Sequence, residues 1–233
     1  MDDFKDYALK HMNISSMQLY YWDKLQESMY SKALVSNSMT PMILEERELR
    51  VTQMSVFDRL MMDRIIWIAG PVNDRMSTVV QAQLMFLDNL EKKDITLHVD
   101  TPGGSVKSGL SIVDVMDYIS SDIVTINTGI AASMGSILLG AGTRGKRYSL
   151  RFSKVMLHQV SSGAEGTLAD IEISLTEAKK YNDLLFGLLG EYTNKSPETV
   201  KKDANRDLWL TSNEALNYGI IDEVILTKKA KKK

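Results

Sequence analysis

The sequence predicts an α/β fold built from repeated βαβ units. Three observations predict this class: short apolar runs that stop at glycine or proline, amphipathic helical patterns, and the alternation of the two along most of the chain. The chain has 233 residues, which fits one large domain, or a domain of about 200 residues with an N-terminal extension. Its 44% hydrophobic and 25% charged residues are ordinary for a globular protein and exclude wholesale disorder.

Strands and helices alternate over the first half of the expected domain. The strands are apolar runs that stop at turn signals, such as Gly70-Pro71 and Pro102-Gly103-Gly104. The first helix has apolar residues at steps of four and three, from Met76 to Leu87. In chain order we expect a strand at 64–70, a helix at 76–90, a strand at 95–99, a helix at 110–119, a strand at 123–126 and a helix of small residues from 133.

A further strand at 154–158 precedes one long helix that runs to about Thr193. This helix starts at Thr167-Leu-Ala-Asp170, which resembles a capping box with Asp in place of Glu or Gln. Part of its apolar stripe could meet another subunit, and a core helix lying across the sheet fits the same pattern equally well. The stripe consists of Leu168, Ile171, Leu175, Ala178, Tyr181, Leu185 and Leu188.

The two ends of the chain differ in composition from the expected domain. Residues 1–37 are rich in Met and Ser without Pro or Gly, which fits a frayed helical extension or a propeptide. Residues 228–233 are nearly all lysine, and we expect a disordered basic tail. The start lacks the features of a secretion signal, and the most apolar stretch, 128–142, is too short to span a bilayer. We therefore expect a cytoplasmic protein.

The composition excludes several kinds of site. The absence of cysteine excludes disulfides, zinc thiolate sites, iron–sulfur clusters and cysteine nucleophiles. The only histidines are His11, His98 and His158, which argues against a multi-histidine metal site and restricts the choice of a histidine base. The formal net charge of -2 indicates neither a nucleic-acid partner nor a membrane partner.

One glycine cluster matches a nucleotide-binding pattern. Gly140-Ala-Gly142-Thr-Arg-Gly145 satisfies GxGxxG, and the following Lys146 nearly completes a P-loop. Such loops follow a strand and open a helix, because phosphate binds at the helix N-terminus. Here the glycines follow a helical pattern and precede the strand-like 147–150. We interpret them as a helix C-cap and turn.

Four elements together favour acyl-transfer chemistry, although each also has a purely structural interpretation. Ser133 follows a strand among small residues and could be a nucleophile or an ordinary N-cap serine. His158 ends a strand, where a general base is useful, but a structural histidine fits too. Asp207 could orient an imidazole, and spacing does not exclude Asp203. The amides of Gly103-Gly104 could form an oxyanion hole or a plain turn.

The same segments resemble the ClpP family of serine peptidase subunits, which work with ATP-driven unfoldases. The resemblance covers residues 41–226, and the order and spacing of its motifs are specific. The matching motifs are Arg64-Ile-Ile-Trp-Ile68, Gln81-Ala-Gln-Leu-Met-Phe-Leu87, Thr101-Pro-Gly-Gly104, Ala131-Ala-Ser-Met-Gly135, Gly145-Lys-Arg-Tyr148, Val155-Met-Leu-His-Gln159, Asp170-Ile-Glu-Ile173, Asn205-Arg-Asp207 and Tyr218-Gly-Ile-Ile-Asp222.

The resemblance implies a complete set of catalytic groups. Ser133 matches the nucleophile, His158 the base and Asp207 the orienting acid, which decides between the two aspartates. The backbone amides of Gly104 and Met134 match the oxyanion hole. The implied reaction is peptide hydrolysis through an acyl-enzyme. It implies no cofactor, because ATP is used only by the partner unfoldase.

The resemblance also implies a crotonase-like fold with a protruding handle helix. In that family two heptameric rings of the chain stack around a chamber. The helix from Thr167 matches the handle, loop 161–166 matches the glycine-rich strand beside the site, and the mature start falls near Ser38. The serine peptidase domain would then be 38–227, after a propeptide. The implied partners are polypeptide substrates and an AAA+ unfoldase of the ClpX, ClpA or ClpC type.

The chain departs from the family pattern at several positions. Val160 replaces the proline that usually follows His-Gln, and Asp100-Thr101 replaces Asn-Ser. Thr96 and His98 replace aromatics of the pocket that docks unfoldase loops. An apolar loop would lose buried area at Thr96, worth about 25 cal/mol per Å², so we expect weak docking of a standard partner. The implied docking positions are His98, Tyr118, Ile126, Thr128, Tyr148, Leu150 and Ile225.

The sequence leaves three functional hypotheses. The first is a self-compartmentalising serine endopeptidase that hydrolyses unfolded polypeptides delivered by an unfoldase. The second is a weakly active or non-catalytic ring subunit that assembles with an active paralogue, which the altered docking positions motivate. The third is a crotonase-fold enzyme acting on acyl-CoA, a class that usually needs a glutamate base. The complete Ser-His-Asp set favours the first hypothesis.

Overall fold

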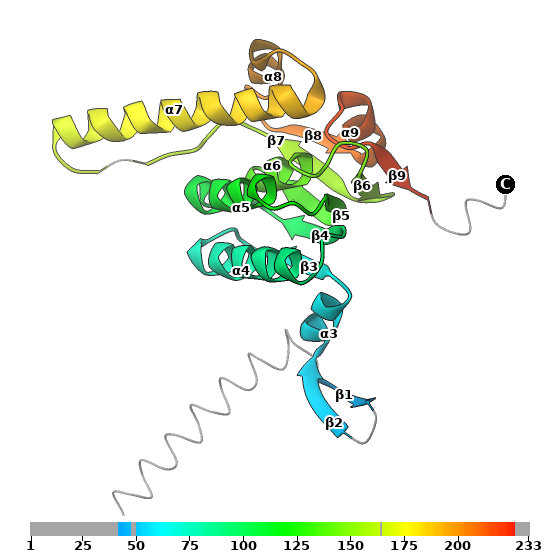
Figure 1. Cartoon of the computed structure of the whole chain (residues 1–233). Helices are drawn as coiled ribbons and strands as arrows, with labels where there is room; N and C mark the ends of the chain where they lie inside the picture. Colours follow the sequence, from blue (N-terminus) through cyan, green and yellow to red (C-terminus); the bar gives the residue numbers. More distant parts are fainter. Residues whose placement is uncertain (1–41, 48–49, 164, 227–233) are drawn as a thin grey trace, which may run out of the picture. The chain divides into compact units, whose positions relative to one another are not determined.

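The structure, a computed structural model, describes residues 42–47, 50–163 and 165–226 (Figure 1). The expected extension 1–37 and the basic tail 228–233 lie outside the described residues. The chain divides into two compact units, Met1–Arg59 and Leu60–Lys233. In the first unit, β1 (Met42–Arg47) and β2 (Arg50–Ser55) pair as an antiparallel hairpin. Helix α3 (Val56–Met62) follows and contains the boundary between the two units. The sequence analysis predicted none of these three elements.

The second unit contains the predicted parallel sheet with its βαβ connections. Its main path runs in the order β3-β4-β5-β6-β9, with every neighbouring pair parallel. Two more strands lie off this path: β7 pairs parallel with β5, and β8 pairs antiparallel with β7. The strands are β3 (Ile65–Ala69), β4 (Ile95–Thr101), β5 (Ile123–Ala132), β6 (Arg147–Leu150), β7 (Lys154–Leu157), β8 (Leu208–Thr211) and β9 (Glu223–Ile225).

Strand β5 is longer than the sequence predicts and divides its pairing between two neighbours. Its first half, Thr125–Asn127, pairs with β6, and its last three residues, Ile130–Ala132, pair with β7. The sequence prediction ended the strand at residue 126. The ladder with β7 extends the strand beyond that position. As a result β5 ends directly at Ser133.

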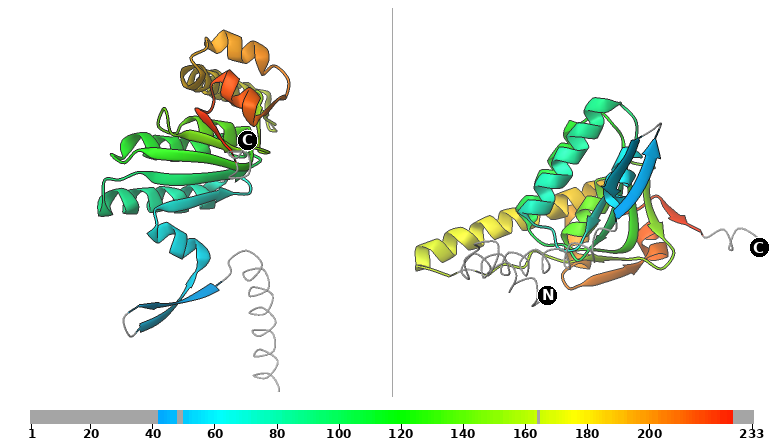
Figure 2. Two further views of the ribbon diagram at one scale, coloured as in Figure 1. Left: turned by 90° about the vertical axis from the view of Figure 1, so that its right-hand side faces the viewer. Right: turned by 90° about the horizontal axis from the view of Figure 1, so that it is seen from below.

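Three helices pack in sequence against the sheet. Helix α4 (Asp74–Leu90) packs on β3 and β4, α5 (Val106–Tyr118) packs on α4, and α6 (Met134–Gly140) packs on α5, β4 and β5 (Figures 1 and 2). Of the four apolar residues predicted for one face of α4, Val80, Leu84 and Leu87 are buried, and Met76 is half-buried against the core. Helix α6 ends at Gly140 and the turn at Gly145 leads into β6, so the glycine cluster is the predicted helix end and turn.

The long helix α7 (Leu168–Thr193) protrudes as expected for a handle (Figures 1 and 2). The predicted capping box is present: the Thr167 hydroxyl accepts from the Asp170 amide, and the Asp170 carboxylate accepts from the Thr167 amide. All buried residues of the helix lie in its second half, from Phe186 onwards. In the first half Leu168 is 73% and Ile173 63% exposed. Only the second half is therefore a core helix.

The remaining elements complete the edge of the sheet. Helix α8 (Pro197–Asp203) begins after the N-cap Ser196, and α9 (Ser212–Tyr218) begins with a capping box between Thr211 and Glu214. Strands β8 and β9 are three or four residues long. The sequence pattern predicted neither of them.

A nearly buried ion pair joins β6 to the segment before β9. The Arg147 guanidinium donates to both carboxylate oxygens of Asp222, at 2.9 and 2.6 Å, and to the Tyr192 carbonyl at 2.9 Å. The Arg147 side chain is 5% exposed. Partial burial opposes ionisation of Asp222, but the bonds from Arg147 and the Gly145 amide hold the pKa of Asp222 below its ordinary value.

We expect Asp222→Asn to lower the free energy of unfolding at pH 7 by about 3 kcal/mol, because it leaves the Arg147 charge buried and unpaired. The exposed Asp114→Asn on α5 is the matched control and should change it little. Urea unfolding measures both. Because the folded-state pKa of Asp222 is lowered, its contribution should be present above pH 3.8 and vanish as the pH falls through the folded-state pKa. Equal losses in the two variants would contradict this account.

Candidate active site

The chain reverses direction at a single strained residue, Ser133. Strand β5 ends at Ala132 and α6 begins at Met134, so Ser133 makes the whole turn with φ 54° and ψ −121°. A non-glycine residue in this region costs on the order of 1–3 kcal/mol and needs support from its surroundings. The Ser133 amide donates to the Met156 carbonyl at 2.9 Å, and its carbonyl accepts from the Ser136 amide at 2.9 Å and hydroxyl at 2.6 Å. These bonds hold the turn from both sides.

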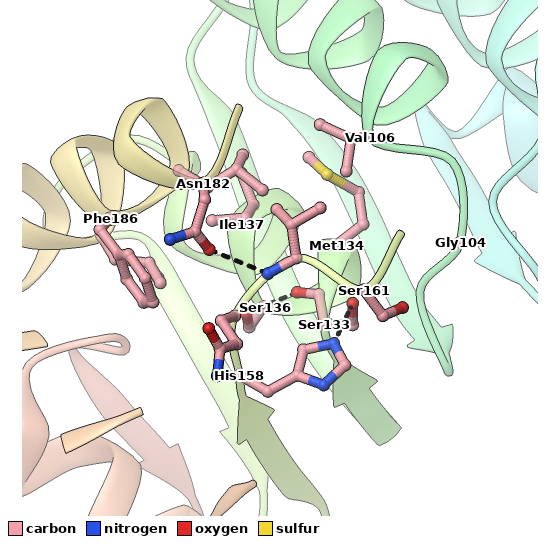
Figure 3. Close-up of a pocket in the computed structure, with 14 residues that line it drawn as sticks. Gly104, Val106, Ser133, Met134, Ser136, Ile137, His158, Ser161, Asn182 and Phe186 are labelled. Carbon is pink, nitrogen blue, oxygen red and sulfur yellow. Dashed lines mark hydrogen bonds between the residues drawn. The ribbon is translucent and has the colours of Figure 1, made fainter. Parts of the chain in front are cut away.

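The hydroxyl of Ser133 contacts the imidazole of His158. Ser133 occupies the N-cap position of α6 but caps no amide, so the interpretation as an ordinary cap serine is wrong. Its Oγ lies 2.8 Å from Nε2 of His158 (Figure 3). Ser133 directly follows β5, and His158 directly follows β7. The two strands are parallel neighbours, and the last pair in their ladder is Ala132 with Met156, so the pairing brings Ser133 and His158 together.

Asp207, not Asp203, lies beside the imidazole. Its Oδ1 is 3.5 Å from Nδ1 of His158, which is an ion-pair distance but longer than an ordinary hydrogen bond, and its side chain is 61% exposed. Asp207 immediately precedes β8, whose first residue pairs with Leu157, and this pairing places it there. Asp203 instead accepts a hydrogen bond from the Tyr218 hydroxyl at 3.1 Å. Of the two candidate aspartates, Asp207 is therefore the one that lies within ion-pair distance of the imidazole.

A second chain segment places amide donors next to the serine. Val72 forms a parallel bridge with Gly104: its amide donates to the Gly103 carbonyl at 2.8 Å, and its carbonyl accepts from the Ser105 amide at 2.9 Å. In such a bridge the amide of the central residue, Gly104, points away from Val72. Gly104 lines the same pocket as Ser133 and Met134. As the first residue of α6, Met134 has an amide without an acceptor inside the helix.

Gly103 packs directly against the turn at Ser133, so the glycine pair does more than reverse the chain. A Cβ on Gly103, where φ is +92°, would lie 2.7 Å from both the Ala132 carbonyl oxygen and the Ser133 Cβ. Buried Thr101 holds the segment: its hydroxyl donates to the Gly70 carbonyl at 2.6 Å and accepts from the Gly103 amide at 3.0 Å. No local sequence pattern indicated this role of Thr101.

The second half of α7 forms one wall of a pocket that opens beside Ser133 (Figure 3). Half of the 14 residues around it are apolar, and Asn182 is a polar member of the α7 wall. Sequence reasoning missed this wall, although the spacing of its residues is helical. The wall consists of Asn182, Leu185, Phe186 and Leu189, and Val106 and Ile137 lie among the other lining residues.

The implied docking positions fall into two groups and one separate residue. Thr128, Leu150 and Ile225 surround one hollow together with Arg151 and Phe152. A second group forms a row across β4, β5 and β6, because its members are register partners in adjacent strands. Tyr118 belongs to neither group and is 78% exposed at the end of α5. The row consists of His98, Ile126 and Tyr148.

The row on the sheet ends in an aromatic stack. The His98 ring lies parallel to the Trp67 ring, with centroids 4.6 Å apart. Burial lowers the pKa of His98, which favours the neutral imidazole. The neutral imidazole keeps an aromatic face against Trp67, and its Nδ1 is buried with no hydrogen-bond partner among the described residues.

The arrangement around Ser133 is typical of hydrolases that act through a serine nucleophile. It joins a serine hydroxyl, an imidazole at hydrogen-bond distance, a carboxylate beyond the imidazole and backbone amides at a helix start. Within the described ranges, no three His, Asp or Glu side chains are grouped so that they could hold a metal ion. Among the helices described, none is long and apolar enough to cross a membrane.

Comparison with known proteins identifies the family. Residues 47–228 match the family model described as Clp protease. The chain is 45% identical, over 98% of its length, to the whole ATP-dependent Clp protease proteolytic subunit of Bacteroides fragilis (strain YCH46), and 45% identical, over the same shares, to that of Bacteroides thetaiotaomicron. It is 43% identical to the same subunit of Porphyromonas gingivalis, over 97% of this chain and 98% of that one. The chain belongs to the Clp protease family and is a peptidase.

We expect Gly103→Ala to slow the reaction of Ser133 with a fluorophosphonate at least about tenfold, because the new Cβ would displace the serine turn. Gly145→Ala is the matched control, since its φ of +83° is also positive but no heavy atom lies within 4 Å of the new Cβ. It should lose about 1 kcal/mol of stability and keep the reaction rate. Intact mass spectrometry over time measures the rate. Equal rates in the two variants would show that the close approach is unimportant.

Proposed function

We propose that the chain is a serine endopeptidase that uses Ser133 as nucleophile, His158 as base and Asp207 as the acid that orients the imidazole. The observation that supports this most strongly is the 2.8 Å contact between Ser133 Oγ and His158 Nε2 at a strained strand-to-helix turn. Strain of this kind persists where the surroundings over-determine it, and it is frequent at active sites. A structural serine would satisfy its hydroxyl locally at lower cost.

In the proposed reaction, Nε2 of His158 accepts the Ser133 proton as Oγ attacks the substrate carbonyl carbon. The amides of Gly104 and Met134 donate to the resulting oxyanion. His158 then gives the proton to the leaving amine, and the C–N bond breaks to leave an acyl-enzyme. A water molecule, deprotonated by His158, releases the acyl group and restores the hydroxyl. Asp207 favours the tautomer in which Nδ1 carries the proton.

The side chain next to the scissile bond would enter the pocket beside Ser133. Val106, Ile137, Leu185, Phe186 and Leu189 line this pocket, which favours an apolar side chain. The reaction uses only side chains and amides of the chain, so we propose no cofactor. Any ATP would be consumed by the partner, in keeping with the names of the relatives, which call them ATP-dependent.

We also propose that copies of the chain form two stacked heptameric rings in the cytoplasm and receive unfolded polypeptides from an AAA+ unfoldase of the ClpX, ClpA or ClpC type. Exposed apolar side chains support association. Val79, Phe86 and Leu90 on α4 are 50–63% exposed, and the first half of α7 exposes Leu168 and Ile173. Burying these apolar side chains between subunits would remove them from water and so favour association.

A second candidate is a weakly active ring subunit that depends on an active paralogue. The 3.5 Å separation of Asp207 from His158 and the exposure of the carboxylate favour this candidate. An aspartate in solvent orients an imidazole less firmly than a buried one. The endopeptidase remains the better-supported function because Ser133 and His158 are in hydrogen-bond contact.

A fluorophosphonate should form a single adduct on Ser133 of the purified wild-type protein, and intact mass spectrometry followed by peptide mapping detects it. Ser133→Ala should give no adduct and should lose peptide cleavage by about 10⁴-fold or more. Ser120→Ala removes an exposed hydroxyl as the matched control and should behave as wild type. Cleavage that persists unchanged in Ser133→Ala would refute the proposal. A wild type that is unlabelled alone but labelled with a paralogue would favour the second candidate.

Leu150→Glu should weaken unfoldase-dependent degradation of a folded protein at least about tenfold, because it places a charge in the hollow formed with Thr128 and Ile225. Its cleavage of short peptides without the unfoldase should be unchanged. Leu216→Glu on α9 is the control, since Leu216 is 38% and Leu150 37% exposed. Equal losses in both variants would argue against docking at this hollow.

A further inference from the structure

The segment that follows His158 belongs to no helix or strand, and two hydrogen bonds hold it in place. Strand β7 ends at Leu157, and the next residues belong to no regular element. The Gln159 side chain donates to the Asn205 carbonyl at 3.1 Å. The Val160 amide donates to Oδ1 of Asn182 at 2.9 Å (Figure 3). The segment is therefore tied at two successive residues.

The two bonds lead to different parts of the site. Asn205 lies two residues before Asp207, so the Gln159 bond ties the histidine segment to the loop of the orienting acid. Asn182 lies on α7, so the Val160 bond ties the same segment to the helix that forms the pocket wall. The position of the imidazole thus depends on α7 as well as on β7.

Asn182 stands at a position where packing alone would favour an apolar residue. It lies three, four and seven residues before Leu185, Phe186 and Leu189, which places all four on one helix face. A polar side chain on such a face loses hydration and must find a partner. Its oxygen finds one in the Val160 amide, which has no ladder partner of its own.

A bond two residues from His158 can control the imidazole at the precision that the reaction needs. Two residues span at most about 7 Å of chain, so a fixed Val160 amide leaves little freedom for the His158 Cα. Catalytic groups generally need to be held within about 0.5 Å of their productive geometry. The turn already fixes the position of Ser133. The 2.8 Å distance between Ser133 Oγ and His158 Nε2 therefore depends mainly on the position of His158.

We propose that Asn182 is a positioning residue for His158, acting through the amide of Val160. This inference rests on the proposed function and deepens it, because it adds a group that touches neither the substrate's reacting atoms nor Ser133. Loss of the hydrogen bond between Val160 and Asn182 should not change the fold or the pocket, but it should let the imidazole move away from the Ser133 hydroxyl. The effect should therefore appear in the maximal rate of serine modification and not in reagent affinity.

The test measures the maximal rate and the half-saturating concentration for fluorophosphonate labelling of Ser133 in the full-length protein. Asn182→Leu, which keeps the shape but removes the acceptor, should lower the maximal rate about tenfold with the half-saturating concentration unchanged. Asn182→Asp keeps the acceptor and should remain within about threefold of wild type. Asn217→Leu makes the same change at an exposed site on α9 and serves as the matched control.

A double-mutant cycle links the effect to this one bond. Replacing the Val160 amide by an ester, through incorporation of the α-hydroxy analogue of valine, removes the donor and keeps the side chain. It should also lower the maximal rate, whereas adding it to Asn182→Leu should cause no further loss. The ester and Asn182→Asp also test the bond if the leucine variant does not fold. Additive losses, a wild-type rate in Asn182→Leu, or a change confined to the half-saturating concentration would overturn the positioning role while leaving the proposed function intact. A wild type without any adduct would overturn both.

Discussion

The arrangement of the site depends on the single-residue turn at Ser133. A residue with φ 54° between a strand and a helix would relax if its neighbours allowed it. Here the Ser133 amide donates to a carbonyl of β7, and the Ser133 carbonyl accepts from Ser136. Gly103 lies so close to the turn that a Cβ on Gly103 would not fit. The surrounding fold therefore holds the hydroxyl away from the amides it would otherwise cap and directs it at His158.

The divided strand β5 explains why three distant segments meet at this turn. Its first half belongs to the continuous parallel sheet with β4 and β6, and its end pairs with β7, which in turn pairs with β8. Ser133, His158 and Asp207 each adjoin one of these strands at the same place. Helix α7 then covers the opening with its second half, so one helix both lines the pocket and extends away from the domain.

The sequence predicted the local elements and left their long-range contacts open. Apolar runs and helical periodicity identified β3, β4, α4 and the start of α7, because these signals depend on neighbouring residues. The residues alone left the roles of Ser133 and His158 open between catalytic and structural, and the family resemblance implied the catalytic roles. The bridge of Val72 to Gly104 and the bond of Val160 to Asn182 left no local pattern, since each joins residues over 20 positions apart.

We propose that the turn at Ser133 aims the hydroxyl at a substrate carbonyl whose oxygen accepts hydrogen bonds from the Gly104 and Met134 amides. A crystal structure of the protein after reaction with a fluorophosphonate tests this most directly. We expect phosphorus bonded to Ser133 Oγ and the phosphonyl oxygen about 2.7–3.1 Å from both amide nitrogens. A phosphonyl oxygen directed away from both amides, or an adduct on another residue, would contradict the account.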